Sequence, residues 1–297
     1  MSRKFLCLIF LVITCSFAAS AQVAAQATSI LVCAINRDGT NLRRIKQFDQ
    51  FFRIGSPALS PDGKTLAFDA LEPGLDWSDS KLMTLELATG ESTLLWPGAM
   101  PTWSQDGTSL VYSSYHPNGL FERTLDGEAS MEIDRGWSIK LSPNGHLHAH
   151  TNGGNLTVSN IQTGLTRQIQ PDPQRPFSQI IYNFGWSNDN RRIAFAGVRA
   201  DGAREIAIID VLAENPTAYV SFPMGSFGER LSWRPQSEEI AATKFEKFAQ
   251  IYIFKAEENA TPVRLAGQPE NRWNTNTVWS HDGKMLYFFS AERPPAE

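Results

Sequence analysis

A short phrase that recurs six times constrains the fold of this chain more than any other feature. A complete copy reads Leu59-Ser60-Pro61-Asp62-Gly63-Lys64, an apolar residue followed by a tight turn. The six copies start at Leu59, Trp103, Leu141, Trp186, Trp233 and Trp279, in steps of 38 to 47 residues. A period of about 40 to 50 residues made of short strands is typical of propellers and solenoids.

Each repeat contains signals for four strands. In the turn, Pro61 fixes φ and Gly63 supplies a positive φ, which together reverse the chain. The segments that follow, such as 65–68, 193–195 and 285–289, are β-prone and almost entirely apolar, as strands buried on both faces must be. A second hairpin then follows, with Gly, Asn or Asp at its tip. Four antiparallel strands per unit describe a propeller blade.

The two ends of the chain carry complementary halves of a repeat. Residues 30–45 contain only the second hairpin, and residues 279–290 contain only the first. Pairing of these halves would remove exposed sheet edges and close a ring, which a linear β-solenoid would not need. We therefore predict an all-β, six-bladed β-propeller with four-stranded antiparallel blades, closed by the N-terminal strands pairing with the C-terminal hairpin. It forms a single domain over residues 28–290, followed by a C-terminal tail, 291–297.

The first residues have the pattern of a secretory signal peptide. Arg3 and Lys4 precede the apolar run 5–13, and Ala19-Ser20-Ala21 offers a cleavage site. We expect residues 1–21 to be removed by cleavage after Ala21, leaving no membrane span and a periplasmic or extracellular protein; an uncleaved anchor is the alternative. Cleavage removes two of the 27 basic residues and none of the 31 acidic ones, so the composition argues against a nucleic-acid partner.

Cysteine usage predicts no internal disulfide. Cys7 and Cys15 lie in the leader, which leaves Cys33 alone. Cys33 belongs to the apolar run 30–35, so we expect a buried, unreactive thiol.

The repeated phrase, with Leu-Ala/Val-Phe/Tyr after its turn, resembles the WD-repeat-like repeat of TolB-like β-propellers, which also occurs in the propellers of prolyl oligopeptidase-type peptidases. The resemblance covers residues 28–290 and implies the fold, while the repeat itself is a packing device. TolB carries an extra N-terminal domain and the peptidases carry a hydrolase domain with a Gly-x-Ser-x-Gly elbow, and we expect neither here. Blades four and five depart from the phrase, because Asn190 replaces Gly and Gln236-Ser237 replaces Asp-Gly.

One histidine cluster offers a candidate metal site. His146, His148 and His150 alternate along a segment, so a strand would point them the same way. The segment aligns with residues 64–68, inside the second strand of a blade, where side chains pack between blades. We therefore favour an irregular third blade, and we expect no metal and no cofactor.

The recurring turn carboxylates do not indicate catalysis. They occupy one position of the phrase, at Asp62, Asp106, Asp189 and Asp282. Recurrence in successive blades predicts turn capping. We nominate no catalytic residue.

The connections from the outer strand of one blade to the inner strand of the next carry a second pattern. Five of the six combine an arginine with a nearby aromatic residue. Arginine offers planar donors to carboxylate or phosphate, and an aromatic ring offers stacking area. The candidate ligand-binding residues are Arg53, Arg135, Trp137, Arg175, Arg230, Arg272 and Trp273. The alternative is that these arginines hold the loops together, with Asp134 and Glu229 as partners.

These observations predict a monomeric, non-catalytic module that binds a protein segment or an anionic small ligand on the loop face around the central channel. The alternative is a carbohydrate-active enzyme that resembles oligogalacturonate lyases, or another hydrolase, acting at the same face. Such a lyase would lose turnover of uronate oligomers when its metal is stripped, whereas a binding module would lose partner affinity when the face arginines are replaced.

Overall fold

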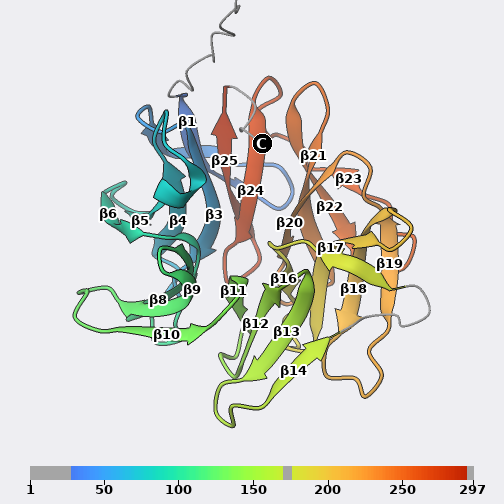
Figure 1. Cartoon of the computed structure of the whole chain (residues 1–297). Coiled ribbons are helices and arrows are strands. Elements are labelled where there is room, and N and C mark those ends of the chain that lie inside the picture. Colours follow the sequence, from blue (N-terminus) through green and yellow to red (C-terminus); the bar gives the residue numbers. More distant parts are fainter. Residues whose placement is uncertain (1–27, 170–175, 293–297) are drawn as a thin grey trace, which may run out of the picture.

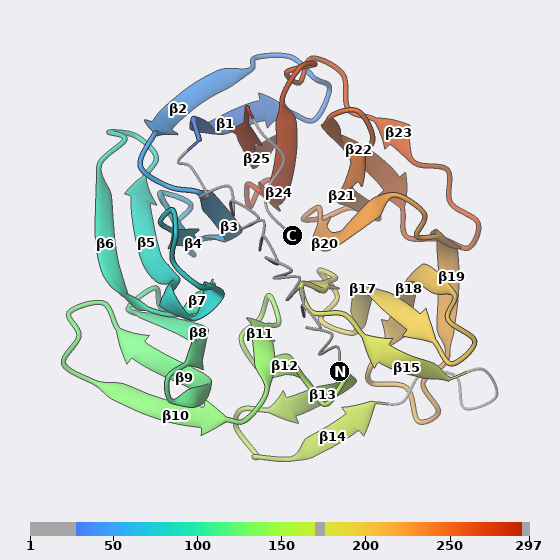
Figure 2. The ribbon, with the colours of Figure 1, turned by 45° about the horizontal axis from the view of Figure 1, so that its top comes forward.

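The computed structural model describes residues 28–169 and 176–292, and their strands form six antiparallel sheets arranged around a common axis (Figures 1 and 2). This is the predicted six-bladed β-propeller. Residues 1–21, the expected signal peptide, lie outside the described part of the chain, as do residues 293–297 of the expected tail.

The first three blades follow one another along the chain, each running from an inner to an outer strand. Blade 1 comprises β3 (Arg53–Leu59), β4 (Thr65–Leu71), β5 (Lys81–Glu86) and β6 (Ser92–Pro97), with the 3-10 helix η1 (Trp77–Asp79) between β4 and β5. Blade 2 comprises β7 (Ala99–Trp103), β8 (Ser109–Tyr115), β9 (Asn118–Thr124) and β10 (Ser130–Asp134). Blade 3 comprises β11 (Trp137–Leu141), β12 (Leu147–Asn152), β13 (Asn155–Asn160) and β14 (Thr166–Ile169).

Blade 4 has a divided inner edge, because two short segments pair with the same second strand. It comprises β15 (Phe177–Ile180), β16 (Gly185–Trp186), β17 (Arg192–Arg199), β18 (Arg204–Asp210) and β19 (Ala218–Pro223). Blade 5 comprises β20 (Phe227–Trp233), β21 (Glu239–Phe245), β22 (Ala249–Lys255) and β23 (Val263–Arg264).

The sixth, closing blade is built from both ends of the chain, as the half-repeats predicted. It comprises β24 (Trp273–Trp279), β25 (Met285–Ala291), β1 (Ile30–Asn36) and β2 (Arg43–Phe48). β1 pairs with β25 from Ile30↔Ala291 to Asn36↔Met285 without a register shift. Figure 2 shows blue β1 beside red β25. The first and last strands are thereby covered, and the ring is closed.

Apolar side chains between neighbouring sheets form the core. Phe68 of blade 1 packs edge-on against Phe289 of the closing blade, with ring centroids 5.6 Å apart, and both rings are almost fully buried. Burial of one such side chain contributes about 1.5 to 3 kcal/mol. Cys33 lies in this interior, where burial raises the pKa of its thiol to about 11. The predicted burial of this thiol is confirmed.

The repeated turns are capped by their own side chains. The Ser60 hydroxyl donates to Asp62 at 2.6 Å, and Asp62 accepts the backbone N–H of Lys64 at 3.1 Å. The hydrogen bond from Ser60 lowers the pKa of the Asp62 carboxyl. Equivalent pairs occur at Ser104–Asp106, Ser187–Asp189 and Ser280–Asp282. The predicted capping role of the recurring carboxylates is therefore confirmed.

The irregular turn of blade 4 keeps the same backbone shape without glycine. Asn190, at the glycine position, has φ of 59°, in the left-handed region that glycine usually occupies. In blade 5 the positive φ, 55°, lies at Gln236, one residue before the glycine position, so that turn differs from the others. Asparagine tolerates this region well, and the turn at Asn190 closes as its counterparts do.

Three tryptophans of the phrase tie a blade to the one before it, whereas Trp233 donates to Ser237 O in its own turn. The indole Nε1 of Trp103 donates to the carbonyl of Ala58 at 3.0 Å. Trp186 bonds Lys140 O and Trp279 bonds Ser232 O in the same way, both at 3.1 Å. Each indole therefore packs in an interface between blades while its polar atom is satisfied.

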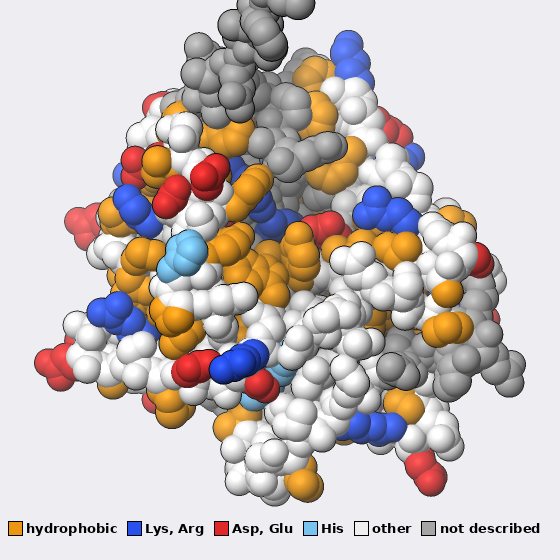
Figure 3. All heavy atoms as spheres, viewed as in Figure 1, with side chains coloured by type: hydrophobic (Ala, Val, Ile, Leu, Met, Phe, Trp, Pro, Cys, Tyr) orange, Lys and Arg blue, Asp and Glu red, His pale blue; other side chains and the backbone are white. Residues whose placement is uncertain are grey.

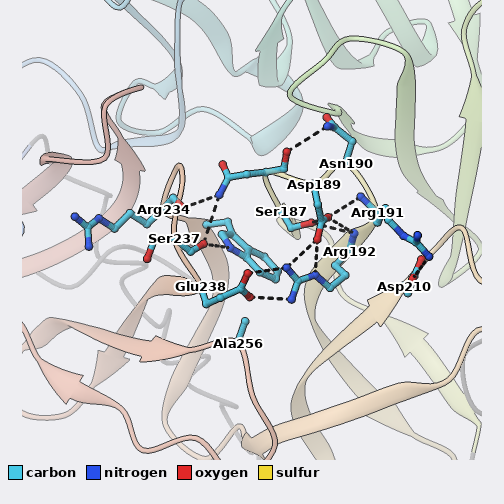
Figure 4. A network of polar contacts seen from close by, with 12 residues as sticks. Ser187, Asp189, Asn190, Arg191, Arg192, Asp210, Arg234, Ser237, Glu238 and Ala256 are labelled. Atoms are coloured by element: carbon cyan, nitrogen blue, oxygen red, sulfur yellow. Dashed lines mark hydrogen bonds and ion pairs between the residues drawn. The ribbon is translucent and has the colours of Figure 1, made fainter.

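A charged network reinforces the boundary between blades 4 and 5. The guanidinium of Arg192 makes two 2.8 Å hydrogen bonds to Glu238 and one to Asp189, and it lies over the Trp233 ring (Figure 4). The bond to Glu238 raises the pKa of Arg192. Planar, bidentate pairing of this kind fixes both side chains and links the two turns.

The histidine-bearing second strand of blade 3 pairs regularly with the third, where the sequence analysis favoured an irregularity. β12 pairs with β13 continuously from Leu147↔Asn160 to Asn152↔Asn155. The strand accommodates two of the histidines, His148 and His150, in buried positions. His146 precedes β12 and is exposed. The predicted distortion was wrong.

Arg272 is placed to hold the closed ring together. Its guanidinium donates to the carbonyls of Ser29 and Ser290 at 2.9 and 2.8 Å, and its side chain is 18% exposed. We expect Arg272→Ala to lower the free energy of unfolding by about 2 kcal/mol, since hydrogen bonds from a charged, partly buried group are lost. Urea unfolding followed by tryptophan fluorescence measures the change.

Lys284→Ala is the matched control in the same blade. Lys284 is 81% exposed and lies 3.6 Å from Asp282, so its loss should change stability by less than about 0.5 kcal/mol. Equal effects of the two substitutions would contradict the role assigned to Arg272.

Candidate functional site

Two sets of connections share one end of the propeller, which we call the loop face. They are the outer-to-inner links, such as residues 49–52 and 135–136, and the links between second and third strands, such as residues 72–80 and 200–203. Because strands within a blade are antiparallel, the repeated tight turns lie at the opposite end, the turn face. Loops above a rigid scaffold are the usual location of binding residues.

Inner strands carry a recurrent bulge three residues before the repeated phrase. Ser56, Met100, Ser138, Asn183 and Asn276 occupy this position with φ between 50° and 78°. Positive φ at non-glycine residues is strained and persists only where the surroundings hold it. The position is therefore structurally fixed in five of the six inner edges of the described chain, and blade 5 has Arg230 there.

Side chains of the preceding blade hold three of these bulges. Asp69 Oδ2 accepts the N–H of Met100 at 2.9 Å. Ser113 Oγ accepts the N–H of Ser138 at 2.9 Å, and Ser138 Oγ accepts that of Asn183 at 3.1 Å. All these contacts are buried. They fix the orientation of neighbouring inner strands, and hence of the side chains that face the axis.

A charged group, which we call the axial cluster, gathers where the inner strands face one another. Its members are Arg53, Asp69, Lys140, Glu229 and Arg230. Arg230 of blade 5 donates from Nη1 to Ser56 Oγ of blade 1 at 2.8 Å, so it reaches past the closing blade. Gly55 allows this convergence, because a Cβ there would lie 2.8 Å from Asp69 Oδ1, 3.2 Å from Arg53 Nη2 and 3.5 Å from Arg230 Nη1.

Positive charge exceeds negative charge in the axial cluster. Burial, and then repulsion from Arg230, lowers the pKa of Lys140 to about 8. Burial, and then repulsion from Arg53, lowers the pKa of Arg230 to about 10. Within the described residues the side-chain ammonium of Lys140 makes no hydrogen bond or ion pair, although its backbone carbonyl accepts from Trp186. A bound anion would relieve this repulsion.

A pocket of about 700 Å³ opens beside the axial cluster, over blade 3. Its walls come from blades 2, 3 and 4 and include Arg135, Trp137, Asn152, Gln179 and Tyr182. Trp137 packs against Tyr115 with ring centroids 4.5 Å apart. Tyr182, one of the wall residues, is also near enough to Arg230 to interact with it electrostatically.

The structure brings together two pairs of the predicted ligand-binding residues. Arg53 and Arg230 meet in the axial cluster, and Arg53 also stacks on Trp77 of η1 at 4.1 Å. Arg135 and Trp137 line the pocket.

The other three predicted residues lie elsewhere or outside the description. Arg272 is engaged in ring closure, and Trp273 packs against Phe245 with ring centroids 6.2 Å apart. Arg175 lies outside the described residues.

Sequence reasoning missed Asp69 and Lys140, although aligned repeats carry a signal for both. Lys140 directly precedes the phrase, where the other copies have Ala58, Thr102, Gly185, Ser232 and Val278. Asp69 lies ten residues after Leu59, where blades 2 and 3 have Ser113 and Thr151. A charged residue at a position where the other blades have small or uncharged residues indicates a role specific to that blade.

A separate cluster lies at the boundary between blades 2 and 3. Ligand atoms of Asp134, His148 and His150 all lie within 4.8 Å of one another, and His146 does not join them.

Figure 3 shows acidic and basic side chains interspersed over the visible face, so no single charge dominates it. Among the residues that the structure covers, no helix has the length and apolarity to cross a membrane.

Comparison with known proteins identifies the fold and nothing finer. No protein-family model matches this sequence, and no curated protein matches it. Among solved structures, a protein assigned as TolB from Agrobacterium tumefaciens superposes with a TM-score of 0.67 at 14% identity, over 90% of this chain and 99% of the other.

Two further structures extend the comparison. TolB from Acinetobacter baumannii has a TM-score of 0.59 at 16% identity, over 90% of this chain and 64% of its own. A GH74 enzyme from Niastella koreensis has a TM-score of 0.55 at 12% identity, over 89% of this chain and 51% of the enzyme. The TolB-like propeller fold expected from the repeat is therefore confirmed, while identities this low leave function open.

The lowered pKa of Lys140 predicts a pH-dependent stability. Between pH 8 and the ordinary lysine value the unfolded chain binds more protons than the folded one, so stability gains from this residue as pH rises. Between pH 7.5 and pH 9.5 the free energy of unfolding of the wild type should rise by on the order of 1 kcal/mol relative to that of Lys140→Met. Urea unfolding of both proteins at the two pH values measures this difference. Lys284→Met should follow wild type, and parallel curves for wild type and Lys140→Met would contradict the prediction.

Proposed function

We propose that this chain is a non-catalytic binding module that holds an acidic protein segment on its loop face, with a carboxylate of the segment in the axial cluster. The observation that carries this proposal is the convergence of Arg53, Lys140 and Arg230 beside only two carboxylates. A carboxylate placed there would gain charge-assisted hydrogen bonds from donors that are already positioned.

The pocket beside the cluster supports a segment in preference to a small anion. Trp137 and Tyr182 supply flat, apolar area with polar edges, and Arg135 adds a donor at the rim. Aromatic and arginine side chains around one pocket are typical of the anchoring points of protein interfaces. Because the inner strands are held by buried bonds, binding would cost little ordering of the protein.

The remaining parts of the proposal follow from the sequence. The basic and apolar pattern of residues 1–21 supports export to the periplasm or the exterior. We propose a monomer, with residues 28–290 acting as one unit. Similarity to the GH74 enzyme concerns the fold alone, and no observation of comparable weight favours a carbohydrate-active enzyme.

Hexaglutamate is a defined probe for the binding step. We expect calorimetric binding at low ionic strength that weakens with added salt, and no binding of hexalysine. Replacing both Lys140 and Arg230 by Met should reduce affinity at least about tenfold, since each loses a charge-assisted contact. Lys284→Met on the turn face is the control. Equal affinity of the double variant and the control for hexaglutamate would refute the proposal. Failure of the wild type to bind hexaglutamate would refute it as well.

The same probe should report the titration of Lys140. Affinity for hexaglutamate should fall as pH rises from 7 to 9, because Lys140, with a pKa of about 8, loses its charge while Arg230, with a pKa of about 10, keeps most of its own. In Lys140→Met the fall should be largely absent. An unchanged slope in that variant would contradict the assignment. Affinity capture from the native cell envelope, with mass spectrometry of the retained proteins, would then identify the partner.

A further inference from the structure

We propose that Asp134, His148 and His150 form a binding site for a divalent transition metal, with Zn²⁺ as the best match. This site goes beyond the proposed function and shares no residue with the axial cluster. It rests on three observations: the geometry of the three side chains, a buried nitrogen of His148 without a partner, and the close fit of the neighbouring loop.

The fold brings the three side chains together from two blades. His148 and His150 alternate along β12, so both lie on the same face of that strand. Asp134 ends β10 of blade 2, and after two intervening residues the chain enters β11 of blade 3 at Trp137. The carboxylate is thereby carried to the histidine pair, although β10 and β12 belong to different sheets.

The distances are close to those of a coordination sphere. Asp134 Oδ2 lies 3.7 Å from His150 Nε2. Two ligand atoms that each lie about 2.1 Å from a tetrahedral metal are about 3.4 Å apart. The widest separation between ligand atoms in the cluster is 4.8 Å or less, so small side-chain rotations would bring these atoms to the spacing of metal ligands. The side chain of Asp134 is 39% exposed, which leaves a route for an ion to enter.

Buried polar atoms at the cluster lack partners. In the described chain, His148 Nε2 and His150 Nδ1 are buried with no hydrogen bond. The residues as a whole are 8% and 1% exposed. An unsatisfied buried polar atom costs about 1 to 3 kcal/mol. A metal ion that accepts the lone pair of His148 Nε2 would offset this cost at that nitrogen, whereas at His150 the nitrogen beside Asp134 is Nε2 and not the unpartnered Nδ1.

Imidazole binds a metal through its neutral form. Asp134 supplies the negative charge that favours a divalent cation.

The connection to β11 is shaped around His150. Gly136 has φ of 136°, and a Cβ there would lie 2.7 Å from His150 Cδ2 and 2.6 Å from Thr151 O. A larger residue would push the loop, and with it the adjacent Asp134, away from the ring. The glycine thus keeps the carboxylate within reach of the histidines.

Two nitrogens and one carboxylate oxygen select the kind of metal. Imidazole ligands suit Zn²⁺, Cu²⁺ and Ni²⁺, whereas Ca²⁺ and Mg²⁺ require oxygen ligands. Three protein ligands leave one tetrahedral position, which water would occupy.

The test is metal binding by the full chain, purified without a polyhistidine tag. We expect about one Zn²⁺ per chain by elemental analysis after dialysis, and a visible Co²⁺ spectrum of low-symmetry, nitrogen- and oxygen-ligated type. His150→Ala and His148→Ala should each weaken calorimetric Zn²⁺ affinity at least about 100-fold, more than the usual loss of a second-shell partner. Hexaglutamate binding should be retained in both, which separates this site from the axial cluster.

His146→Ala is the matched control, since this exposed histidine lies two residues before His148 and outside the cluster. Its Zn²⁺ affinity should equal that of wild type. Asp134→Asn is a second test that leaves the core intact, because the Asp134 side chain is partly exposed and asparagine has nearly the same shape. Its Zn²⁺ affinity should fall at least about tenfold. Equal Zn²⁺ affinity in wild type, His150→Ala and Asp134→Asn would overturn the proposal, as would a wild type that binds no Zn²⁺.

Discussion

Seven consecutive pairs between β1 and β25 join residues about 250 positions apart, and the rest of the propeller depends on them. Without that pairing, β1 and β25 would each expose an unpaired edge, and the core between blade 1 and the closing blade would lose Phe289 and its neighbours. Arg272 adds hydrogen bonds to Ser29 and Ser290 at the same seam. Closure is thus both a backbone and a side-chain interaction, and it sets the position of every inner strand relative to the axis.

Closure has a functional consequence, because only a closed ring places side chains of distant repeats opposite one another. Arg230 and Ser56 are separated by 174 residues and yet form a hydrogen bond that reaches past the closing blade. The buried links at Met100, Ser138 and Asn183 then hold the inner strands in strained but fixed conformations. The positive charges of the axial cluster are therefore kept close at a cost in free energy that a bound anion would reduce.

Blade 3 contributes to each of the sites discussed above. Lys140 of β11 faces the axial cluster, Trp137 of the same strand lines the pocket, and β12 carries the histidine pair beside Asp134. Chains such as this one use a common repeat for packing, and individual blades then acquire residues that packing does not require. Departures from the repeat, such as Lys140 and His148, are accordingly better guides to function than the repeat itself.

The sequence by itself determined the six repeats, the half-units at its ends, the capped turns and the buried state of Cys33, because turn chemistry and apolar alternation act over a few residues. It also indicated Arg53, Arg230, Arg135 and Trp137 as residues of one face. Only the tertiary structure decided that Asp69 and Lys140 join the arginines, that Arg272 holds the seam, and that Asp134 rather than His146 stands beside His148 and His150. These assignments depend on contacts between different blades, and such contacts are set by strand register and by how neighbouring blades pack, which no local pattern encodes.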